Sequence, residues 1–220
     1  MLDVVPLIRN GDAEKWQRLL RGLWLSGLRI SEALSLSWEE DVPLSVCLNG
    51  PYPKLRIWAE GEKAHQDRLL PITPDFGQFL LDVLPAERHG LVFGIEGPEP
   101  GKPMSVKRAV RTVSTIGREA GIVVNKATGK FASAHDLRRA FGTRWAVRLM
   151  PAQLQRLMRH RSVETTMRYY VGFDADQETT DLWRRFGGCP NGCPDSSMNG
   201  EPVENSGGHG IRTHNRFLGT

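Results

Sequence analysis

The stretch SAHDLRR at 133–139 carries the strongest structural and chemical signal in this 220-residue chain. Ser133 and Asp136 have the spacing of a capping box, in which two side chains satisfy backbone N–H groups at the start of a helix. The pattern therefore predicts a helix that begins just after Ser133. His135 falls in its first turn, and Arg138 follows one turn further along the same face. A helix N-terminus with these two side chains is a suitable seat for a phosphate group.

Two further segments with chemically active side chains follow this helix, LMRH at 157–160 and MRYY at 167–170. His160 is expected in a turn between helices, and Ser162 is a good N-cap for a last helix that presents Tyr169. Arginine binds phosphate through paired N–H groups, histidine moves protons near neutral pH, and tyrosine can hold a phosphoryl group covalently. Together these residue types suit attack on a phosphodiester without a metal.

The N-terminal part of the chain contributes the segment SGLRISEAL at 26–34, which contains Arg29 and Glu32. Apolar residues at helical spacing predict a helix over 14–24, which Gly27 ends. A second helix is predicted to start after Ser31. Its apolar side chains would point toward the core of the domain.

The remaining elements predict the fold class. Strand-like segments at 44–48, 55–58 and 68–72 are separated by turn signals and would form a small antiparallel sheet. Thr73 and Pro74 are typical of a helix start. Further helices are expected at 75–83, 105–120, 134–149, 151–158, 163–170 and 175–186. The order predicts a mainly helical α+β fold in which a small antiparallel sheet packs beside helices.

The end of the chain differs in composition from the rest. Eight of its last 34 residues are glycine, and the apolar periodicity disappears there. We therefore expect a single domain over 1–186 and a disordered tail over 187–220. The tail contains two cysteines and two histidines, but their spacing fits no strong zinc-finger pattern, and we expect no bound metal.

Positive charge is concentrated in the middle of the chain. Residues 1–100 contain ten Lys or Arg and fifteen Asp or Glu, whereas residues 101–170 contain fifteen and three, a net charge of +12. Arginine outnumbers lysine by 22 to 7, which favours paired contacts with phosphate. This distribution is typical of a protein that binds a polyanion, although a solvated basic surface is the simpler alternative.

Cysteine usage and hydropathy predict the cellular compartment. Cys47, Cys189 and Cys193 are an odd number with no framework spacing, which indicates a reducing, cytoplasmic environment. No apolar run is long enough to span a bilayer, and the first ten residues have no signal-peptide pattern. We therefore expect a soluble intracellular protein.

In their order and spacing, these segments resemble the catalytic domain of the tyrosine recombinases, or phage-type integrases, from about Leu19 to Trp183. The matching features include Arg29 within 26–34, the spaced His135 and Arg138, and a tyrosine nine residues after His160. The segment KAHQDRLLPI at 63–72 resembles the family's β-hairpin, whose catalytic lysine lies five residues before an Arg-hydrophobic-hydrophobic-Pro sequence. Five motifs in register are far more specific than one.

The resemblance implies a role for each matching residue. Tyr169 would attack the scissile phosphate, forming a 3′-phosphotyrosyl link and releasing a 5′-hydroxyl. Arg29 and Arg138 would bind the non-bridging oxygens and stabilise the five-coordinate state. Lys63 would protonate the departing 5′ oxygen, although an ordinary exposed lysine is also common in such an acidic turn.

The two histidines and one glutamate complete the implied site. His135 would accept the proton of the tyrosine and help to hold the phosphate, and His160 would hydrogen-bond a phosphate oxygen. Glu32 would orient Arg29 or a histidine. Tyr170 competes with Tyr169 for the role of nucleophile, but neighbouring helical residues point about 100° apart, so only one can face the phosphate. The nine-residue interval favours Tyr169.

The implied activity is site-specific DNA recombination, which integrates or excises a mobile element. Because the phosphotyrosine stores the energy of the broken bond, the reaction needs no metal, ATP or other cofactor. Double-stranded DNA is the implied partner, bound by a homotetramer around two duplexes. A type IB topoisomerase, which shares the chemistry, and a non-catalytic DNA-binding remnant remain alternatives.

The chain also departs from the family pattern in two places. Family members carry an N-terminal core-binding domain, whereas here the catalytic pattern begins almost at Met1. We expect that domain to be absent, either because this chain is a fragment or because another polypeptide or accessory protein supplies the missing DNA contacts. This chain alone is expected to bind duplex DNA weakly, through the basic residues of 101–170. Arg159 replaces the commoner glycine before His160, where the extra cation either tightens DNA binding or crowds the turn.

Overall fold

The structure is a computed structural model that describes residues 1–58, 68–99 and 101–170, together with residues 179 and 183. Lys63, the helix expected at 175–186 and the tail expected at 187–220 lie in whole or in large part outside the described residues. All elements below belong to the compact unit Met1–Gly172.

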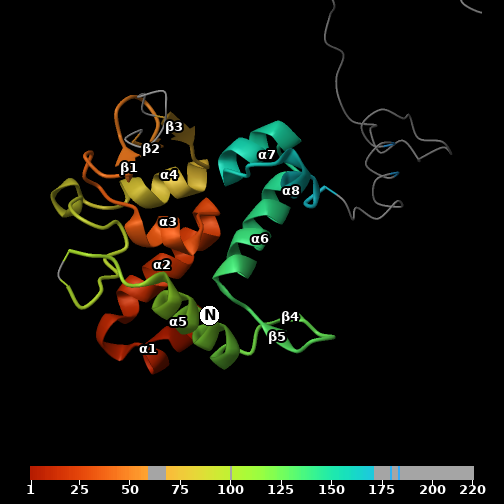
Figure 1. Cartoon of the computed structure of the whole chain (residues 1–220), viewed down its shortest axis with the longest axis horizontal. Coiled ribbons are helices and arrows are strands. Elements are labelled where there is room, and N and C mark those ends of the chain that lie inside the picture. The colour runs from red at the N-terminus through yellow and green to blue at the C-terminus, as the bar shows by residue number, and fades with distance from the viewer. Residues whose placement is uncertain (59–67, 100, 171–178, 180–182, 184–220) are drawn as a thin grey trace, which may run out of the picture. The chain divides into compact units, whose positions relative to one another are not determined.

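The chain has a mainly helical α+β fold, as predicted (Figure 1). Two short α-helices, α1 and α3, and one longer helix, α2, come before a three-stranded antiparallel sheet, and the described chain after the sheet is helical apart from a small hairpin. The elements are α1 (Val5–Ile8), α2 (Ala13–Ser26), α3 (Ile30–Ser35), β1 (Leu44–Cys47), β2 (Lys54–Ile57), β3 (Arg68–Pro71), α4 (Pro74–Leu81), α5 (Val106–Glu119), β4 (Val123–Asn125), β5 (Lys130–Phe131), α6 (Ala134–Ala146), α7 (Pro151–Met158) and α8 (Val163–Met167). Single turns of 3-10 helix lie at Leu2–Val4, Asn10–Asp12 and Pro85–Glu87.

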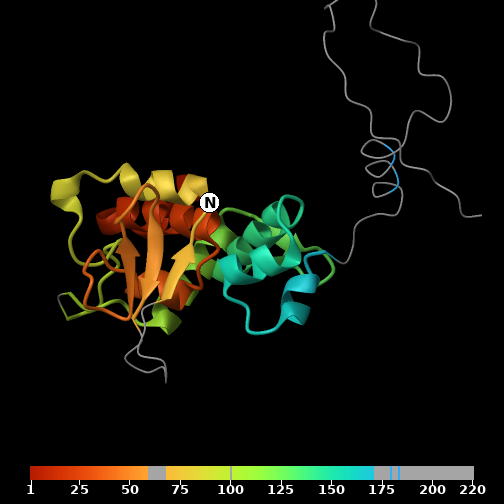
Figure 2. The ribbon, with the colours of Figure 1, turned by 90° about the horizontal axis from the view of Figure 1, so that it is seen from above.

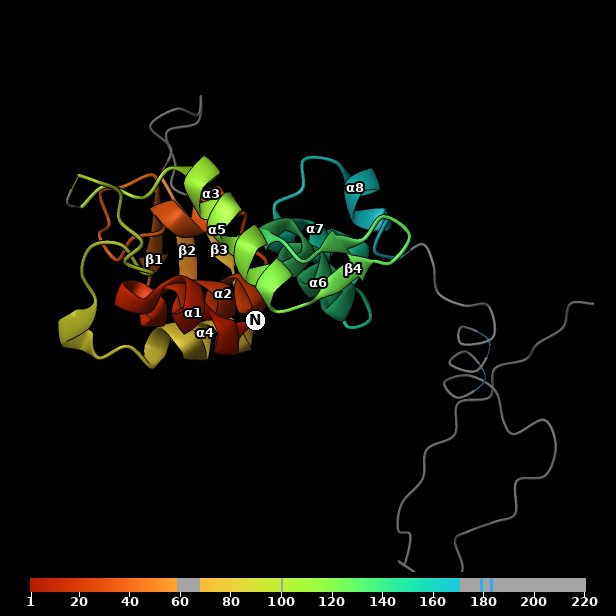
Figure 3. The ribbon, with the colours of Figure 1, turned by 90° about the horizontal axis from the view of Figure 1, so that it is seen from below.

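The larger hydrophobic core joins the sheet to the first helices. Val46 pairs with Leu55 across β1 and β2, and Leu55 pairs with Leu70 across β2 and β3, so one row of side chains is buried. Figures 2 and 3 show α2 and α4 lying together on one side of these strands. The helices contribute fully buried residues such as Trp16 and Phe76 to the same core. The sheet and α2 are thus packed into one core, and this core positions the segment that follows α2.

A second, smaller core lies between α6, α7 and α8. Phe141, Leu154 and Met158 are fully buried there, and Tyr169 and Tyr170 pack against them. Leu154 and Met158 lie one turn apart on α7 and so share one face of that helix. This core carries the segment that contains His160 and both candidate tyrosines.

Most predicted elements are confirmed, with differences at helix ends. The α4 helix begins at Pro74, and the hydroxyl of Thr73 accepts a hydrogen bond from the backbone N–H of Phe76 at 3.3 Å, as the cap signal predicted. The prediction that the last helix continues to Tyr170 was wrong, because α8 ends at Met167. The next N–H groups bond three residues back, Tyr169 to Thr166 and Tyr170 to Met167, which makes a tight turn.

Other features also differ from the sequence prediction. The α3 helix begins at Ile30, ahead of the start predicted after Ser31, because Arg29 is its N-cap residue, and the short α1 helix was not foreseen. The α6 helix ends at Ala146, three residues earlier than expected, and the β4–β5 hairpin was not foreseen. Strands of three and two residues are too short to show an alternating pattern.

None of the helices in the described ranges combines the length and low polarity that a bilayer crossing needs.

Candidate active site

The site begins at the tight turn between α2 and α3. Gly27 ends α2 with φ at 60°, in the left-handed region that favours glycine. A Cβ at Gly27 would lie 2.3 Å from the ring of Phe141 in α6, so glycine also allows close contact with the second core. Arg29 is the N-cap residue of α3, and its side chain is 46% exposed. The turn thus places one guanidinium at the boundary between the two cores.

Glu32, one turn into α3, holds Arg29 in place. One carboxylate oxygen accepts from the backbone N–H of Arg29 at 2.7 Å, and the other accepts from its guanidinium at 2.9 Å. Burial acts to raise the pKa of Glu32, but ion pairs and hydrogen bonds with Arg159 and Arg29 outweigh it and lower that pKa. Glu32 therefore supports Arg29 as a carboxylate, in line with the sequence prediction.

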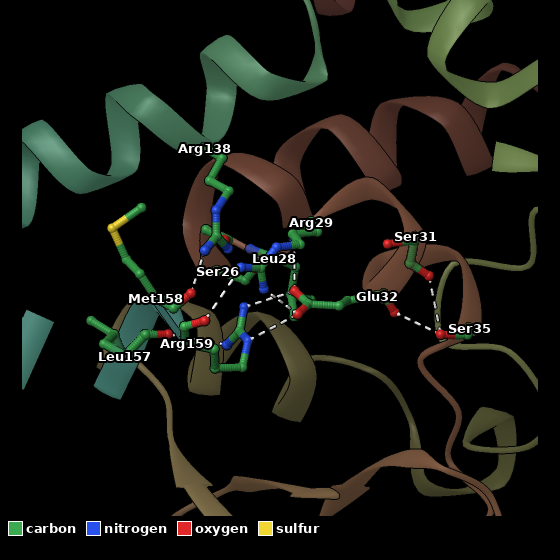
Figure 4. Close-up of polar contacts among 11 residues, drawn as sticks. Ser26, Leu28, Arg29, Ser31, Glu32, Ser35, Arg138, Leu157, Met158 and Arg159 are labelled. Carbon is green, nitrogen blue, oxygen red and sulfur yellow. Dashed lines mark hydrogen bonds and ion pairs between the residues drawn. The ribbon is translucent and has the colours of Figure 1, made fainter. Parts of the chain in front are cut away.

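Arg138 projects from α6 and is only 5% exposed (Figure 4). Its two terminal nitrogens donate to the backbone carbonyls of Gly27, at the end of α2, and of Met158, in the second core. Burial, together with the charges of Arg29 and Arg159, lowers the pKa of Arg138 to about 10. The guanidinium therefore remains charged at neutral pH. It joins the two parts of the site as a buried cation held by carbonyl oxygens.

His160 lies in the turn after α7 and is fixed on two sides. Its Nδ1 is 2.9 Å from the hydroxyl of Thr166, a fully buried residue of α8. Its ring stacks on the ring of Tyr169 with a centroid distance of 5.9 Å and an angle of 9° between the planes. Burial, followed by the charges of Arg138, Arg29 and Arg159, lowers the pKa of His160 to about 4. His160 is therefore neutral at physiological pH.

Tyr169 and Tyr170 have different surroundings. The Tyr170 hydroxyl donates to the backbone carbonyl of Leu149 at 2.6 Å, and burial raises the pKa of Tyr170. The Tyr169 hydroxyl has no hydrogen-bond partner among the described residues, and its ring lies against Gly142. A Cβ at Gly142 would be 2.4 Å from that ring, so only glycine leaves room for it. Tyr170 thus acts as a packing residue, whereas Tyr169 faces a pocket.

Five of the six predicted catalytic residues line one pocket of ≈ 560 Å³. Among the described residues that line it, four are arginines and none is acidic. They are Arg29, His135, Arg138, Arg139, Thr143, His160, Thr165, Arg168 and Tyr169. Lys63, the sixth predicted residue, lies outside the described residues. The pocket combines four guanidinium groups with two imidazoles and one phenol hydroxyl, that of Tyr169.

A second basic pocket adjoins the first, since both are lined by His160. It has a volume of ≈ 690 Å³ and lies between β3 and the end of α7. Its lining includes Arg68, Arg156, Arg159 and Arg161, and none of its nine described lining residues is acidic. His160 thus lines two pockets, each of which is rich in arginine.

Sequence reasoning missed several residues of the site. Thr166, which contacts His160, and Gly142, which accommodates Tyr169, were not singled out. A glycine inside a predicted helix is costly, and that cost was the available signal for Gly142. No local pattern pointed to Thr166 or to the two carbonyls that hold Arg138.

The low pKa of His160 predicts a pH-dependent loss of stability. Between the ordinary value of 6.5 and the folded value of about 4, the unfolded state takes up a proton that the folded state does not. Stability should therefore decrease as the pH falls through this window. We expect the free energy of unfolding to drop by about 1 kcal/mol from pH 7 to pH 5, less than the full shift implies because the ring is partly solvated.

Urea unfolding at the two pH values measures this loss, and His160→Gln is the control. The variant should lose most of the pH dependence, because carboxylates of low pKa titrate below this range. An equal decrease in both proteins would place the effect elsewhere in the chain.

The comparisons with known proteins agree with this fold. A sequence profile of the Phage integrase family matches residues 7–175. Because the match covers most of the sequence, the chain belongs to the phage integrase family, the tyrosine recombinases. No curated protein matches the chain.

Solved structures show the same architecture at low identity. The Tn1549 transposon integrase in complex with transposon right end DNA is 18% identical, with a TM-score of 0.53 over 83% of this chain and 62% of that one. The XerH site-specific recombinase bound to difH substrate is 19% identical, with a TM-score of 0.52 over 83% of this chain and 49% of that one. The chain thus spans less than two thirds of the length of either protein.

Proposed function

We propose that this protein cleaves and rejoins duplex DNA through a covalent 3′-phosphotyrosyl link at Tyr169. The observation that supports this most strongly is the shared pocket. Arg29 reaches it from the α2–α3 turn, His135 and Arg138 from α6, and His160 and Tyr169 from the segments after α7 and α8. Convergence of these residue types from distant segments is what attack on a phosphodiester requires.

The two arginines would bind the scissile phosphate. A guanidinium has five N–H groups. Arg138 uses two N–H groups on the carbonyls of Gly27 and Met158, and Arg29 uses two on Glu32 and the Arg159 carbonyl, so three remain on each. Because both head groups are already held, they can stabilise the charge of the transition state without reorganising.

The remaining residues would move protons. The phenol proton of Tyr169 would pass to His135 as the tyrosine oxygen bonds to phosphorus and the 5′ oxygen departs. His160 is neutral, so a hydrogen bond from the Thr166 hydroxyl to Nδ1 would leave Nε2–H to donate to the phosphate. Lys63 would protonate the 5′ oxygen. Rejoining is the reverse reaction, and neither direction needs a metal or ATP.

A covalent adduct on nicked duplex DNA tests this function. Because the target sequence is unknown, the full chain is incubated with a pool of nicked duplexes of random sequence, from which the cleaved piece diffuses away. Adducts that survive denaturation are captured and sequenced. Adducts enriched for one sequence support a site-specific recombinase, and their absence on every duplex supports the non-catalytic remnant.

The topoisomerase alternative makes a different prediction. A type IB enzyme would relax supercoiled plasmids that lack the selected sequence, and it would do so as a monomer. A recombinase would act only at the selected sites and would assemble a homotetramer on two of them. Sedimentation of the DNA complex and plasmid relaxation therefore separate the two enzymes.

Arginines around the two pockets should make DNA binding depend on salt. Each phosphate that the protein neutralises releases counterions, so the slope of log K against log salt concentration reports the number of contacts. Arg161 is exposed and lines the second pocket. We expect Arg161→Gln to reduce the magnitude of this slope by about 1.

The control for that measurement is Lys102→Gln, because Lys102 lines neither basic pocket and pairs with Glu99. Fluorescence anisotropy with duplex DNA at several salt concentrations measures both slopes. Equal slopes in wild type and Arg161→Gln would show that Arg161, and with it the second pocket, does not contact the DNA phosphates.

The proposed substrate also bears on partners and location. The similar solved structures are of an integrase with transposon DNA and a recombinase with its DNA site, which supports duplex DNA as the partner here. A separate DNA-binding domain or accessory protein would supply further contacts with the DNA. This protein is proposed to act on DNA in the cytoplasm.

A further inference from the structure

Arg159 occupies a backbone conformation that favours glycine. It ends α7 with φ at 55° and ψ at 44°, and it is the one non-glycine residue with positive φ in the described part of the chain. Side chains crowd the backbone in this left-handed region, and glycine is the usual residue there. The turn itself gains nothing from an arginine, so the reason for its presence lies in the side chain.

That side chain turns inward and binds Glu32. Its Nη2 donates to one carboxylate oxygen at 3.0 Å and its Nε to the other at 3.3 Å, while Nη1 donates to the carbonyl of Leu157 at 3.0 Å (Figure 4). The side chain is 10% exposed. Arg159 is therefore an internal cation that holds a carboxylate by two contacts, and it is not a free contact for DNA.

Arg29 is held by the same group of atoms. The carboxylate that Arg159 binds also accepts from the guanidinium of Arg29. The other terminal nitrogen of Arg29 donates to the backbone carbonyl of Arg159 at 3.3 Å. Both contacts that fix the exposed Arg29 side chain thus end on Arg159 or on its partner, Glu32.

Sharing the Glu32 carboxylate between two arginines also changes the net charge beside the pocket. If Glu32 faced Arg29 alone, the pair would be neutral, and Arg29 would attract a phosphate less strongly. With Arg159 present, one carboxylate serves two guanidinium groups and a net positive charge remains. That charge lies beside the pocket that Arg29 lines.

We propose that Arg159 is a positioning residue, which fixes the carboxylate of Glu32 so that Arg29 is held toward the phosphate with its charge available. The inference rests on the proposed function of the pocket. Arg159→Gly is the decisive variant, because glycine suits the backbone and keeps the carbonyl while removing only the side chain.

The first test needs neither DNA nor activity. In the ¹⁵N-labelled full chain, NMR measures rotation of the Arg29 guanidinium in wild type, in Arg159→Gly and in Arg161→Gln, a matched loss of charge two residues away. We expect rotation to become about tenfold faster in Arg159→Gly and to stay unchanged in Arg161→Gln. Unchanged or slower rotation in Arg159→Gly would mean that Glu32 holds Arg29 without help, and would overturn the proposal.

The second test is a double-mutant cycle in single-turnover cleavage at saturating DNA. We expect Arg159→Gly to slow cleavage by about tenfold and to have no further effect in an Arg29→Ala background, because it acts through Arg29. Arg159→Lys, which keeps the charge but lacks the paired geometry, should remain slow. Additive losses, or full rescue by lysine, would overturn the positioning role. If wild type forms no adduct, the proposed function fails, and the NMR test still decides whether Arg159 orients Arg29.

Discussion

Tyr169→Phe is expected to abolish the covalent protein–DNA adduct, with a loss of at least about 1,000-fold, because the attacking oxygen is removed and nothing replaces it. The ring itself should stay in place. It stacks on His160 and packs against Gly142, and neither contact involves the hydroxyl. The folded state and its affinity for DNA should therefore be close to those of wild type.

The matched control is Tyr170→Phe, which removes the neighbouring hydroxyl. That variant leaves the carbonyl of Leu149 without its partner and should lose about 1 kcal/mol of stability. It should nevertheless form the adduct at the wild-type rate. Denaturing gels with labelled nicked DNA measure the adduct, and thermal unfolding measures stability. An adduct that survives in Tyr169→Phe and disappears in Tyr170→Phe would assign the nucleophile to Tyr170.

Arg138→Lys is expected to reduce both cleavage and stability. The rate at saturating DNA should fall by about 100- to 1,000-fold, or about 3–4 kcal/mol, because a fixed donor to the phosphate is lost. An ammonium group cannot reproduce the fork with which Arg138 holds two carbonyls, those of Gly27 and Met158. One buried carbonyl should be left unsatisfied, at a cost of about 1–3 kcal/mol in stability.

Two measurements separate these effects. Single-turnover cleavage is followed well below the unfolding temperature, and the folded fraction is determined under the same conditions. Arg148→Lys serves as the control, because Arg148 is exposed just beyond α6 and stacks over Trp145. A rate loss in Arg138→Lys no larger than the loss of folded protein would leave Arg138 with a structural role alone.

Local signals in the sequence predicted most of the helices and all three strands of the main sheet. The cap at Thr73, the stop at Gly27 and the helix start after Ser133 depend on contacts within a few residues. Such contacts form whatever the rest of the chain does, which is why they could be identified in advance.

Predictions that depend on distant contacts were less complete. The turn that ends α8 at Met167 accompanies a hydrogen bond from Tyr170 to Leu149, 21 residues away in the sequence. The direction of the Arg159 side chain depends on Glu32, which is 127 residues away. Periodicity and capping carry no information over such separations.

The sequence by itself determined the family, the order of the elements and the set of residues proposed for catalysis. Only the tertiary structure decided how those residues meet. Arg138 is buried between the carbonyls of Gly27 and Met158, which lie 111 and 20 residues from it, and this contact brings two separate cores around one pocket. The physical reason is that an arginine can be buried only where packing brings enough acceptors to it, and packing is a property of the whole fold.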